Sequence, residues 1–149
     1  MESWEIEARL LIQKAMNDYG RCVDTGRIEL LAELFTEPCH YDMGTDAVLE
    51  SHAAILERGE LIKQQFRDAP NFGGRVRHHI TPVSVQFLSE TEAKATSYFL
   101  TMGKSGPDHW GVYRDLLVRA DDGWLFKRRV VTVEGHSETS HAAQQSLRK

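Results

Sequence analysis

The second half of the chain constrains the fold most, because four long segments in it have the composition of β-strands and only short turns separate them. These segments are rich in β-branched and aromatic residues and cover residues 75–88, 93–102, 111–119 and 124–133. The turn before the last segment ends in Asp122-Gly123, a pair typical of tight β-hairpins. Since turns this short join antiparallel neighbours, this half of the chain predicts an antiparallel sheet.

The first half of the chain has the apolar spacing of α-helices. The longest apolar face extends from Trp4 to Val23, and Gly26 follows as a typical helix end. Ser3 is the expected N-cap. No capping box is expected with it, because the residue three positions later is Ile6 rather than Glu or Gln.

Two shorter helices and one short strand are expected between this helix and the sheet. The helices cover residues 28–35 and 51–67, and the strand covers residues 39–43. Helices first and hairpin-linked strands second predict an α+β fold, with three helices covering one face of an antiparallel sheet. A sheet curved around a helix leaves a pocket for small molecules. The domain is expected to span residues 1–136, followed by a polar, mobile tail over residues 137–149.

The composition disfavours several kinds of partner. The chain has 149 residues, of which 41% are hydrophobic and 27% charged, and its formal net charge is −4. A weakly acidic chain is a poor candidate for binding nucleic acid, and no apolar run is long enough to span a membrane. We therefore expect a single cytoplasmic domain, with Cys22 and Cys39 as reduced thiols.

No metal ion or cofactor is expected. The two cysteines form no CxxC pair, and the histidines show neither HxH nor HExxH spacing. Gly73-Gly74 lacks the flanking pattern of a phosphate-binding loop.

An acid–base pair, Asp24 and His78, is the leading candidate for catalysis. His78 and His79 open a predicted strand, and since side chains alternate along a strand, only one of them can face a pocket. Asp24 lies at the end of the first helix, where the helix dipole disfavours a carboxylate, which indicates another role. An aspartate that orients a histidine makes a general base.

Tyr19 and Arg129 are further candidates, each with an alternative interpretation. Tyr19 could bond a substrate oxygen, or it could be a core residue of the amphipathic helix. Arg129 shares its strand parity with Val131, which indicates an inward side chain that needs an anionic partner. That partner is either Asp115 on the neighbouring strand or an anion from the substrate.

Three stretches of the chain, taken in order, resemble one family. They are Tyr19-x-Arg21-Cys22-x-Asp24, Arg77-His78-His79-Ile80-Thr81, and Gly111-x-Tyr113-x-Asp115-x-x-x-Arg119 with Gly123-Trp124-x-Phe126-x-x-Arg129. They are similar to the nuclear transport factor 2-like superfamily, in its SnoaL-like, scytalone dehydratase-like branch. Bile-acid 7α-dehydratase and hexachlorocyclohexane dehydrochlorinase are among the proteins it resembles. The resemblance implies a cone-shaped, curved antiparallel sheet around a long N-terminal helix.

The resemblance also implies an activity: a cofactor-independent lyase or isomerase acting on a small hydrophobic, cyclic molecule. His78 falls where these enzymes place their catalytic histidine and would remove a proton from carbon. Asp24 would orient His78, and Tyr19 or Arg129 would stabilise the developing negative charge or the leaving group. The second histidine of scytalone dehydratase has no clear counterpart, and the chain offers His109 or Trp110 in that strand.

A homodimer or homotrimer is expected, since members of this superfamily commonly associate through the sheet. The alternative to an enzyme is a non-catalytic small-molecule-binding or subunit-association domain, similar to the β subunit of ring-hydroxylating dioxygenases.

Overall fold

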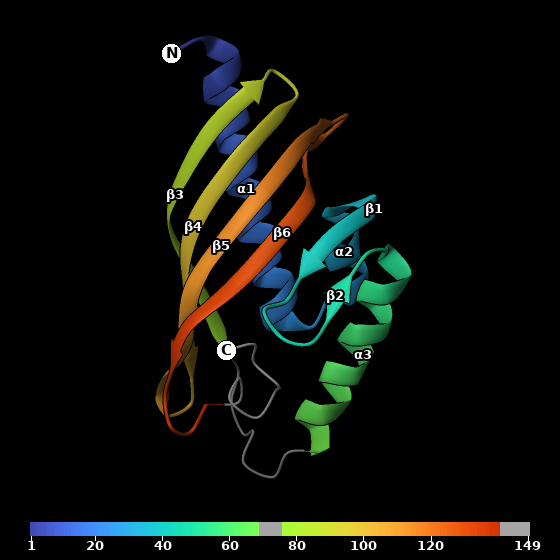
Figure 1. Ribbon diagram of the computed structural model, residues 1–149, viewed down its shortest axis with the longest axis vertical. Helices are drawn as coiled ribbons and strands as arrows, with labels where there is room; N and C mark the ends of the chain where they lie inside the picture. Colours follow the sequence, from blue (N-terminus) through green and yellow to red (C-terminus); the bar gives the residue numbers. More distant parts are fainter. Residues whose placement is uncertain (69–75, 141–149) are drawn as a thin grey trace.

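In the computed structural model, which describes residues 1–68 and 76–140, a strongly curved sheet lies along one side of a long helix (Figure 1). The elements, in chain order, are α1 (Ser3–Thr25), α2 (Ile28–Glu33), β1 (Phe35–Asp42), β2 (Val48–Leu49), α3 (His52–Asp68), β3 (Arg77–Ser89), β4 (Glu92–Gly103), β5 (Gly106–Ala120) and β6 (Gly123–His136). The predicted α+β cone around the N-terminal helix is confirmed. The expected loop at 71–74 lies outside the described residues, as do residues 141–149 of the expected tail.

The sheet has the strand order β2-β1-β6-β5-β4-β3 and is mixed rather than purely antiparallel. The strands β3 to β6 form the antiparallel meander that their short turns predict. However, β1 runs parallel to β6, with Tyr41 opposite Arg129. This pairing joins the first strand of the chain to the last, so no local turn signal reveals it.

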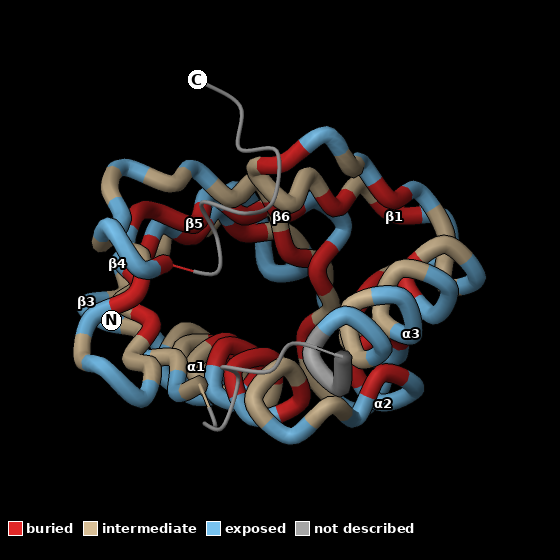
Figure 2. Tube along the Cα trace, turned by 90° about the horizontal axis from the view of Figure 1, so that it is seen from below, coloured by how far each residue is buried: buried red, intermediate tan, exposed pale blue. Residues whose placement is uncertain are grey.

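The helix α1 fills the concave side of the sheet. Its buried face and the inner residues of the strands form one core, and buried residues line both sides of the space between them (Figure 2). The buried residues of α1 are Ala8, Ile12, Ala15, Met16, Tyr19, Gly20 and Cys22. The spacing of these residues is the 3.6-residue apolar period that the sequence shows.

The N-terminus of α1 differs from the prediction. Glu2, not Ser3, is the N-cap, and it forms a capping box in which the Glu2 backbone N–H donates to Glu5 Oε2 at 2.8 Å. Glutamate is not among the residues preferred at the N-cap, so the preference for Ser, Thr, Asp or Asn pointed to Ser3 instead of Glu2. At the other end, Gly26 adopts the left-handed conformation, with φ of 66°, and closes the helix as expected.

The packing of α3 against α2 is unusually close at one point. A Cβ atom on Gly59 would lie 2.7 Å from Cδ1 of Ile28, so only glycine permits this approach. Figure 1 shows α2 and α3 together beside β1 and β2, away from the meander. Together with the C-terminal turn of α1, these elements enclose the cavity described below.

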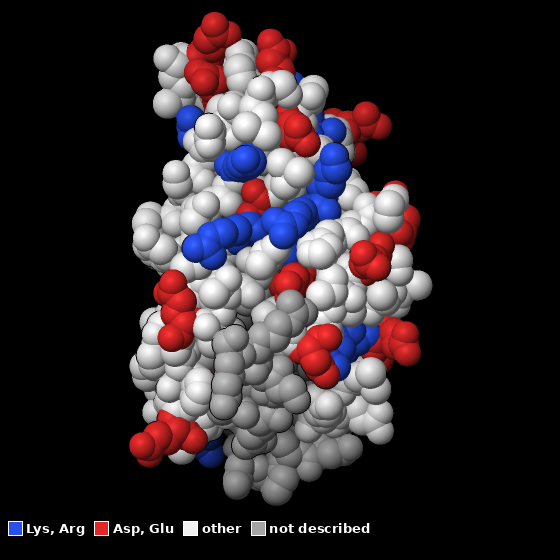
Figure 3. All heavy atoms as spheres, in the orientation of Figure 1, with Lys and Arg blue, Asp and Glu red and all other residues white. Residues whose placement is uncertain are grey.

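The outer face of the sheet carries positive charge. Figure 3 shows Lys and Arg side chains gathered across its middle. Lys94 on β4 and Arg128 on β6 are exposed and flank Leu116 of β5 in register, and exposed Arg114 lies on the same face of β5. These residues are the basic row referred to below.

Candidate active site

Asp24 and His78 meet through a short hydrogen bond. Asp24 lies in the last turn of α1 and His78 in the second position of β3, and Asp24 Oδ1 is 2.6 Å from His78 Nδ1. The backbone N–H of His78 donates to the same carboxylate, at 3.0 Å to Oδ2 and 3.2 Å to Oδ1. Both side chains are only about 10% exposed. The bond to Nδ1 holds that nitrogen protonated, which leaves Nε2 of the neutral ring free to accept a proton.

Two features of the local sequence bring this pair together. Gly20 lies one helical turn before Asp24, and a Cβ there would lie 3.4 Å from Cδ1 of Ile80 and 3.8 Å from Cβ of His78. The small residue therefore lets β3 approach the end of α1 closely. The N–H groups of His78 compensate the carboxylate for its unfavourable place at a helix C-terminus. His79, next on the strand, is exposed, so alternation selects His78.

A second Asp–His pair lies beside the first, and sequence reasoning did not assign it a role. The rings of His78 and His109 are 6.4 Å apart between centroids. His109 Nδ1 lies 2.7 Å from Asp108 Oδ2, and the Ser140 hydroxyl donates to the same oxygen at 2.7 Å. Burial lowers the pKa of His109, against the opposing effect of Asp108, so this ring is neutral near pH 7.

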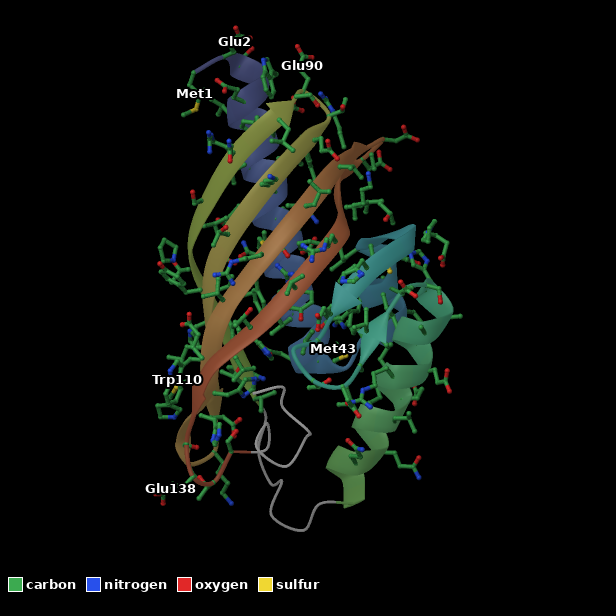
Figure 4. The ribbon with its side chains drawn as sticks, in the orientation of Figure 1. Met1, Glu2, Met43, Glu90, Trp110 and Glu138 are labelled. Atoms are coloured by element: carbon green, nitrogen blue, oxygen red, sulfur yellow. The ribbon has the colours of Figure 1, made fainter. Side chains whose placement is uncertain are left out.

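The sequence did contain a signal for this second pair. Of the two residues offered by the strand, His109 faces the interior, while Trp110 is 39% exposed and projects away from the helices (Figure 4). Ser140 belongs to residues 137–149, which were expected to form a polar, mobile tail. It is instead buried, and the N–H of Ser137 donates to the Asp108 carbonyl at 2.8 Å.

Arg129 is fully buried in an ion pair with Asp115, one of the two interpretations left open by the sequence. Arg129 Nε and Nη2 donate to the two carboxylate oxygens at 2.7 and 2.8 Å, and both side chains are 0% exposed. Burial alone would lower the pKa of Arg129, but Asp115 outweighs it and raises that pKa. Burial also raises the pKa of Asp115, against the effect of Arg129. We assign the ionised pair, because two short charge-assisted bonds reach a guanidinium that does not deprotonate.

Three aromatic rings surround the Arg129 guanidinium. Its Cζ lies 4.1 Å from the ring centroid of Tyr19 and 4.2 Å from those of Tyr113 and Phe126. Since Tyr113 stacks on Phe99 at 4.5 Å and Phe99 contacts His109 at 5.7 Å, two rings separate Tyr19 from His109. Tyr19 and Arg129 are therefore part of one buried cluster in the core.

Tyr19 reaches the cavity through Tyr41. The two phenol oxygens are 2.6 Å apart, and Tyr41 lies in the cavity wall. Burial raises the pKa of Tyr41 well above its usual value, so this phenol keeps its proton. A protonated phenol can donate to an oxygen of a bound molecule.

The cavity lies at the C-terminal end of α1, enclosed by α2, α3 and β1, and has a volume of about 250 Å³. Most of its lining is apolar, including Ile28, Leu31, Tyr41, Met43, Leu49 and Ile55. Figure 4 shows Met43, just after β1, beside the lower end of α1. Asp24 belongs to the same wall, so its hydrogen bond to His78 begins at the edge of the cavity, and His78 itself is not one of the lining residues. Arg58 and Lys63 of α3 are the cations of the lining.

Comparison with protein families shows which family the chain belongs to. Residues 4–130 match the SnoaL-like domain. The chain belongs to the SnoaL-like family. This family, within the NTF2-like superfamily, includes cofactor-independent isomerases, dehydratases and cyclases. None of the curated proteins compared with the chain matches it.

Solved structures of similar shape support the SnoaL-like fold. A putative scytalone dehydratase from Novosphingobium aromaticivorans is 29% identical, with a TM-score of 0.78 over 93% of this chain and 91% of that one. An NTF2-like protein with a cystatin-like fold from the same organism is 22% identical, with a TM-score of 0.72 over 93% and 88%. ActVI-ORFA from Streptomyces coelicolor is 22% identical, with a TM-score of 0.70 over 85% and 97%. The last two likenesses show the fold alone.

The described part of this SnoaL-like domain shows neither a metal-binding cluster nor a membrane-spanning helix. Within residues 1–68 and 76–140, no three His, Cys, Asp or Glu side chains lie close enough to hold a metal ion. In that same part of the chain, no helix combines the length and the apolar character needed to cross a membrane.

Proposed function

We propose that this protein is a cofactor-independent lyase or isomerase that removes a proton from carbon in a small hydrophobic, cyclic molecule. The observation that carries the proposal is the 2.6 Å bond between Asp24 and His78 at the edge of an apolar cavity. An accessory subunit needs no oriented histidine, whereas a general base does.

In this reaction the free Nε2 of His78 takes a proton from a carbon next to a carbonyl group. The C–H electron pair moves toward the carbonyl oxygen, and the Asp24 carboxylate stabilises the imidazolium that forms. Elimination follows when a hydroxyl on the adjacent carbon departs with its bonding pair and receives the proton from His78. The products are an alkene conjugated with the carbonyl and water, and the base is restored.

The neighbouring groups have supporting roles in this proposal. Tyr41 would donate a hydrogen bond to the carbonyl oxygen on which charge develops, and Tyr19, bonded to Tyr41, would act as a positioning residue. The Arg129 guanidinium, 4.1 Å from the centroid of the Tyr19 ring, holds that ring in position. His109 stays neutral, so that the positive charge formed on His78 meets no second cation.

The test compares three variants on a panel of cyclic β-hydroxyketones, with ultraviolet detection of the conjugated enone. His78→Ala should slow the chemical step by roughly 10²–10⁴-fold, the usual effect of removing a general base. Asp24→Asn should also slow it, because the amide favours the wrong tautomer of His78. His79→Ala, on the exposed side of the same strand, is the matched control and should keep full activity.

A second measurement, by NMR, tests the pair without any substrate. The proton shared by Asp24 and His78 should give a low-field NMR resonance that Asp24→Asn abolishes. Full activity in both His78→Ala and Asp24→Asn would refute the general-base role and favour the non-catalytic binding domain. Unfolding of both variants would instead identify the pair as structural.

We also propose that the protein acts as a cytoplasmic homodimer or homotrimer. Both cysteines are free and buried, as expected where thiols stay reduced. Tyr98 on the outer face of the sheet is 57% exposed, so its aromatic ring is open to contact with a second copy of the chain. Analytical ultracentrifugation tests the assembly, and a Tyr98→Glu variant should dissociate it. A monomer at micromolar concentration would contradict the proposal.

A further inference from the structure

Arg58 is a cation in the wall of an apolar cavity, and no carboxylate within residues 1–68 and 76–140 forms an ion pair with it. It projects from α3 into the cavity wall, and its Nε is buried without a hydrogen-bond partner among the described residues. It forms none of the ion pairs found in the described part of the chain. The other long cation of the wall, Lys63, lies 3.4 Å from Glu60 in a half-exposed pair.

Within the described residues, two other arginines also have a buried nitrogen without a partner, but each has further contacts that Arg58 lacks. Arg129 has Asp115, and Arg9 donates to the Val85 carbonyl at 3.2 Å and lies over the ring of Phe87. Arg58 as a whole is partly buried, and burying its Nε is costly unless an acceptor meets it. The carboxylate in the same wall, Asp24, is engaged by His78 and forms no ion pair with Arg58.

We propose that Arg58 binds an oxyanion of the ligand, a carboxylate or a phenolate, while the apolar body of that ligand fills the rest of the cavity. The inference rests on the proposed function, since it names the substrate class of the same site. The ligand is then an aromatic or alicyclic acid or phenol. A planar guanidinium donates two parallel hydrogen bonds to such a group, which fixes orientation as well as charge.

The size of the cavity limits the body of this ligand. A cavity of about 150 Å³ holds benzene. The cavity here, about 250 Å³, has room for two fused rings or for one ring with a short side chain. A ligand of this size, held at α3 by its charged end, extends toward the end of α1.

The positions of the two charges also set the direction of binding. Arg58 comes from α3 and Asp24 from the end of α1, so repulsion from Asp24 keeps the oxyanion on the α3 side. The opposite, uncharged end of the ligand is then directed toward Asp24 and His78. Arg58 is in this sense a specificity-determining residue for the proposed reaction.

The experiment uses two probes of nearly equal shape, 2-naphthoate and its uncharged analogue 2-acetonaphthone, with binding measured by isothermal titration calorimetry. The unaltered protein should bind naphthoate at least about tenfold more tightly than the ketone. Arg58→Met should weaken naphthoate binding by about 10–100-fold, the effect of losing charge-assisted hydrogen bonds, and ketone binding by less than about threefold. Arg58→Lys should restore part of the difference, and Arg27→Met, an exposed arginine outside this wall, is the control.

Equal weakening of both probes, or no change in Arg58→Met, would overturn the proposal, as would absence of naphthoate binding to the unaltered protein. If Arg58→Met does not fold by circular dichroism, Arg58→Gln and Arg58→Lys provide the same comparison. His78→Ala should bind naphthoate normally. If His78→Ala keeps full activity, the proposed function is refuted and the ligand class is not. If only the Arg58 variants behave as the unaltered protein, the ligand class is refuted and the proposed function is not.

Discussion

The coupling free energy between Asp115 and Arg129, which form a buried ion pair, should be far larger than that of a surface ion pair. Replacing Asp115 with Leu would leave the Arg129 guanidinium at 0% exposure without its counter-charge and without the bonds at 2.7 and 2.8 Å. Removing one partner of a buried pair typically costs about 3–5 kcal/mol. The three aromatic rings still contact the cation, and each such contact is worth about 0.5–2 kcal/mol, too little to replace a carboxylate.

The double variant should be far less damaging than this single change suggests. Asp115→Leu with Arg129→Met leaves no unpaired charge, and apolar replacements of a buried pair are often neutral or stabilising. The coupling free energy between the two positions should therefore be about 3 kcal/mol or more. Since domains are stable by only about 5–15 kcal/mol, each single variant should lose a large share of its stability.

Urea unfolding followed by tryptophan fluorescence measures all four proteins of this cycle. The single variants should also melt roughly 6–20 °C lower, from about 2–4 °C per kcal/mol for a chain of this size. Additive losses in the double variant would refute the reasoning. So would a cost below about 1 kcal/mol for Asp115→Leu, the value typical of an exposed pair.

Three further predictions concern other parts of the fold. Gly59→Ala should lower the free energy of unfolding by about 1–3 kcal/mol in urea titrations, because its Cβ meets Ile28; an unchanged midpoint would show that α3 can shift freely. Burial lowers the pKa of His109, so the unfolded state takes up this proton first as pH falls, and stability present above about pH 6.5 should decline below it. His109→Asn should flatten that decline in thermal melts from pH 5 to 7, and an equal slope in both proteins would exclude His109 as its source. Ser140→Ala should cost about 1 kcal/mol in urea titrations, since its hydroxyl donates to Asp108, and no loss would mean that this bond has no net effect.

The parts of this fold that the sequence predicted are those that depend on neighbouring residues. The hairpins of the meander follow from turn residues such as Gly123, and α1 follows from its apolar period. The parallel pairing of β1 with β6 depends on residues about 90 positions apart, Tyr41 and Arg129 among them, and has no local signature. Strand periodicity identifies which residues can form a sheet but not their distant partners.

The parity argument correctly predicted that the Arg129 side chain points inward, but the same argument does not hold along the whole of β6. A register shift in β6, between the partners of Leu116 and Leu117, places Phe126 and Arg129 on the same inner face although they are three positions apart. Such a bulge reverses the alternation, so a parity argument holds on only one side of it. Val131 lies on the same side as Arg129, which is why the argument succeeded.

The candidate site was predicted in part for the same physical reason. Asp24 was out of place at a helix C-terminus, and the family resemblance selected His78 as the histidine that it would meet. The sequence offered His109 and Trp110 as alternatives in the same strand, and simple patterning would turn the more apolar tryptophan inward. Arg58 lies next to Gly59, where α3 packs closely against Ile28 of α2, and no local pattern in the sequence predicts that packing.

The basic row on the outer face has a consequence for how copies of this chain meet. Two copies related by a two-fold axis through the centre of that row would bring Lys94, Arg114 and Arg128 against the same residues of the partner, and such like charges repel within a Debye length of about 8–10 Å. An axis displaced toward Tyr98 avoids that repulsion. In the first arrangement the assembly tightens as ionic strength rises, and in the second it is nearly indifferent to salt. The salt dependence of self-association thus locates the symmetry axis on the sheet.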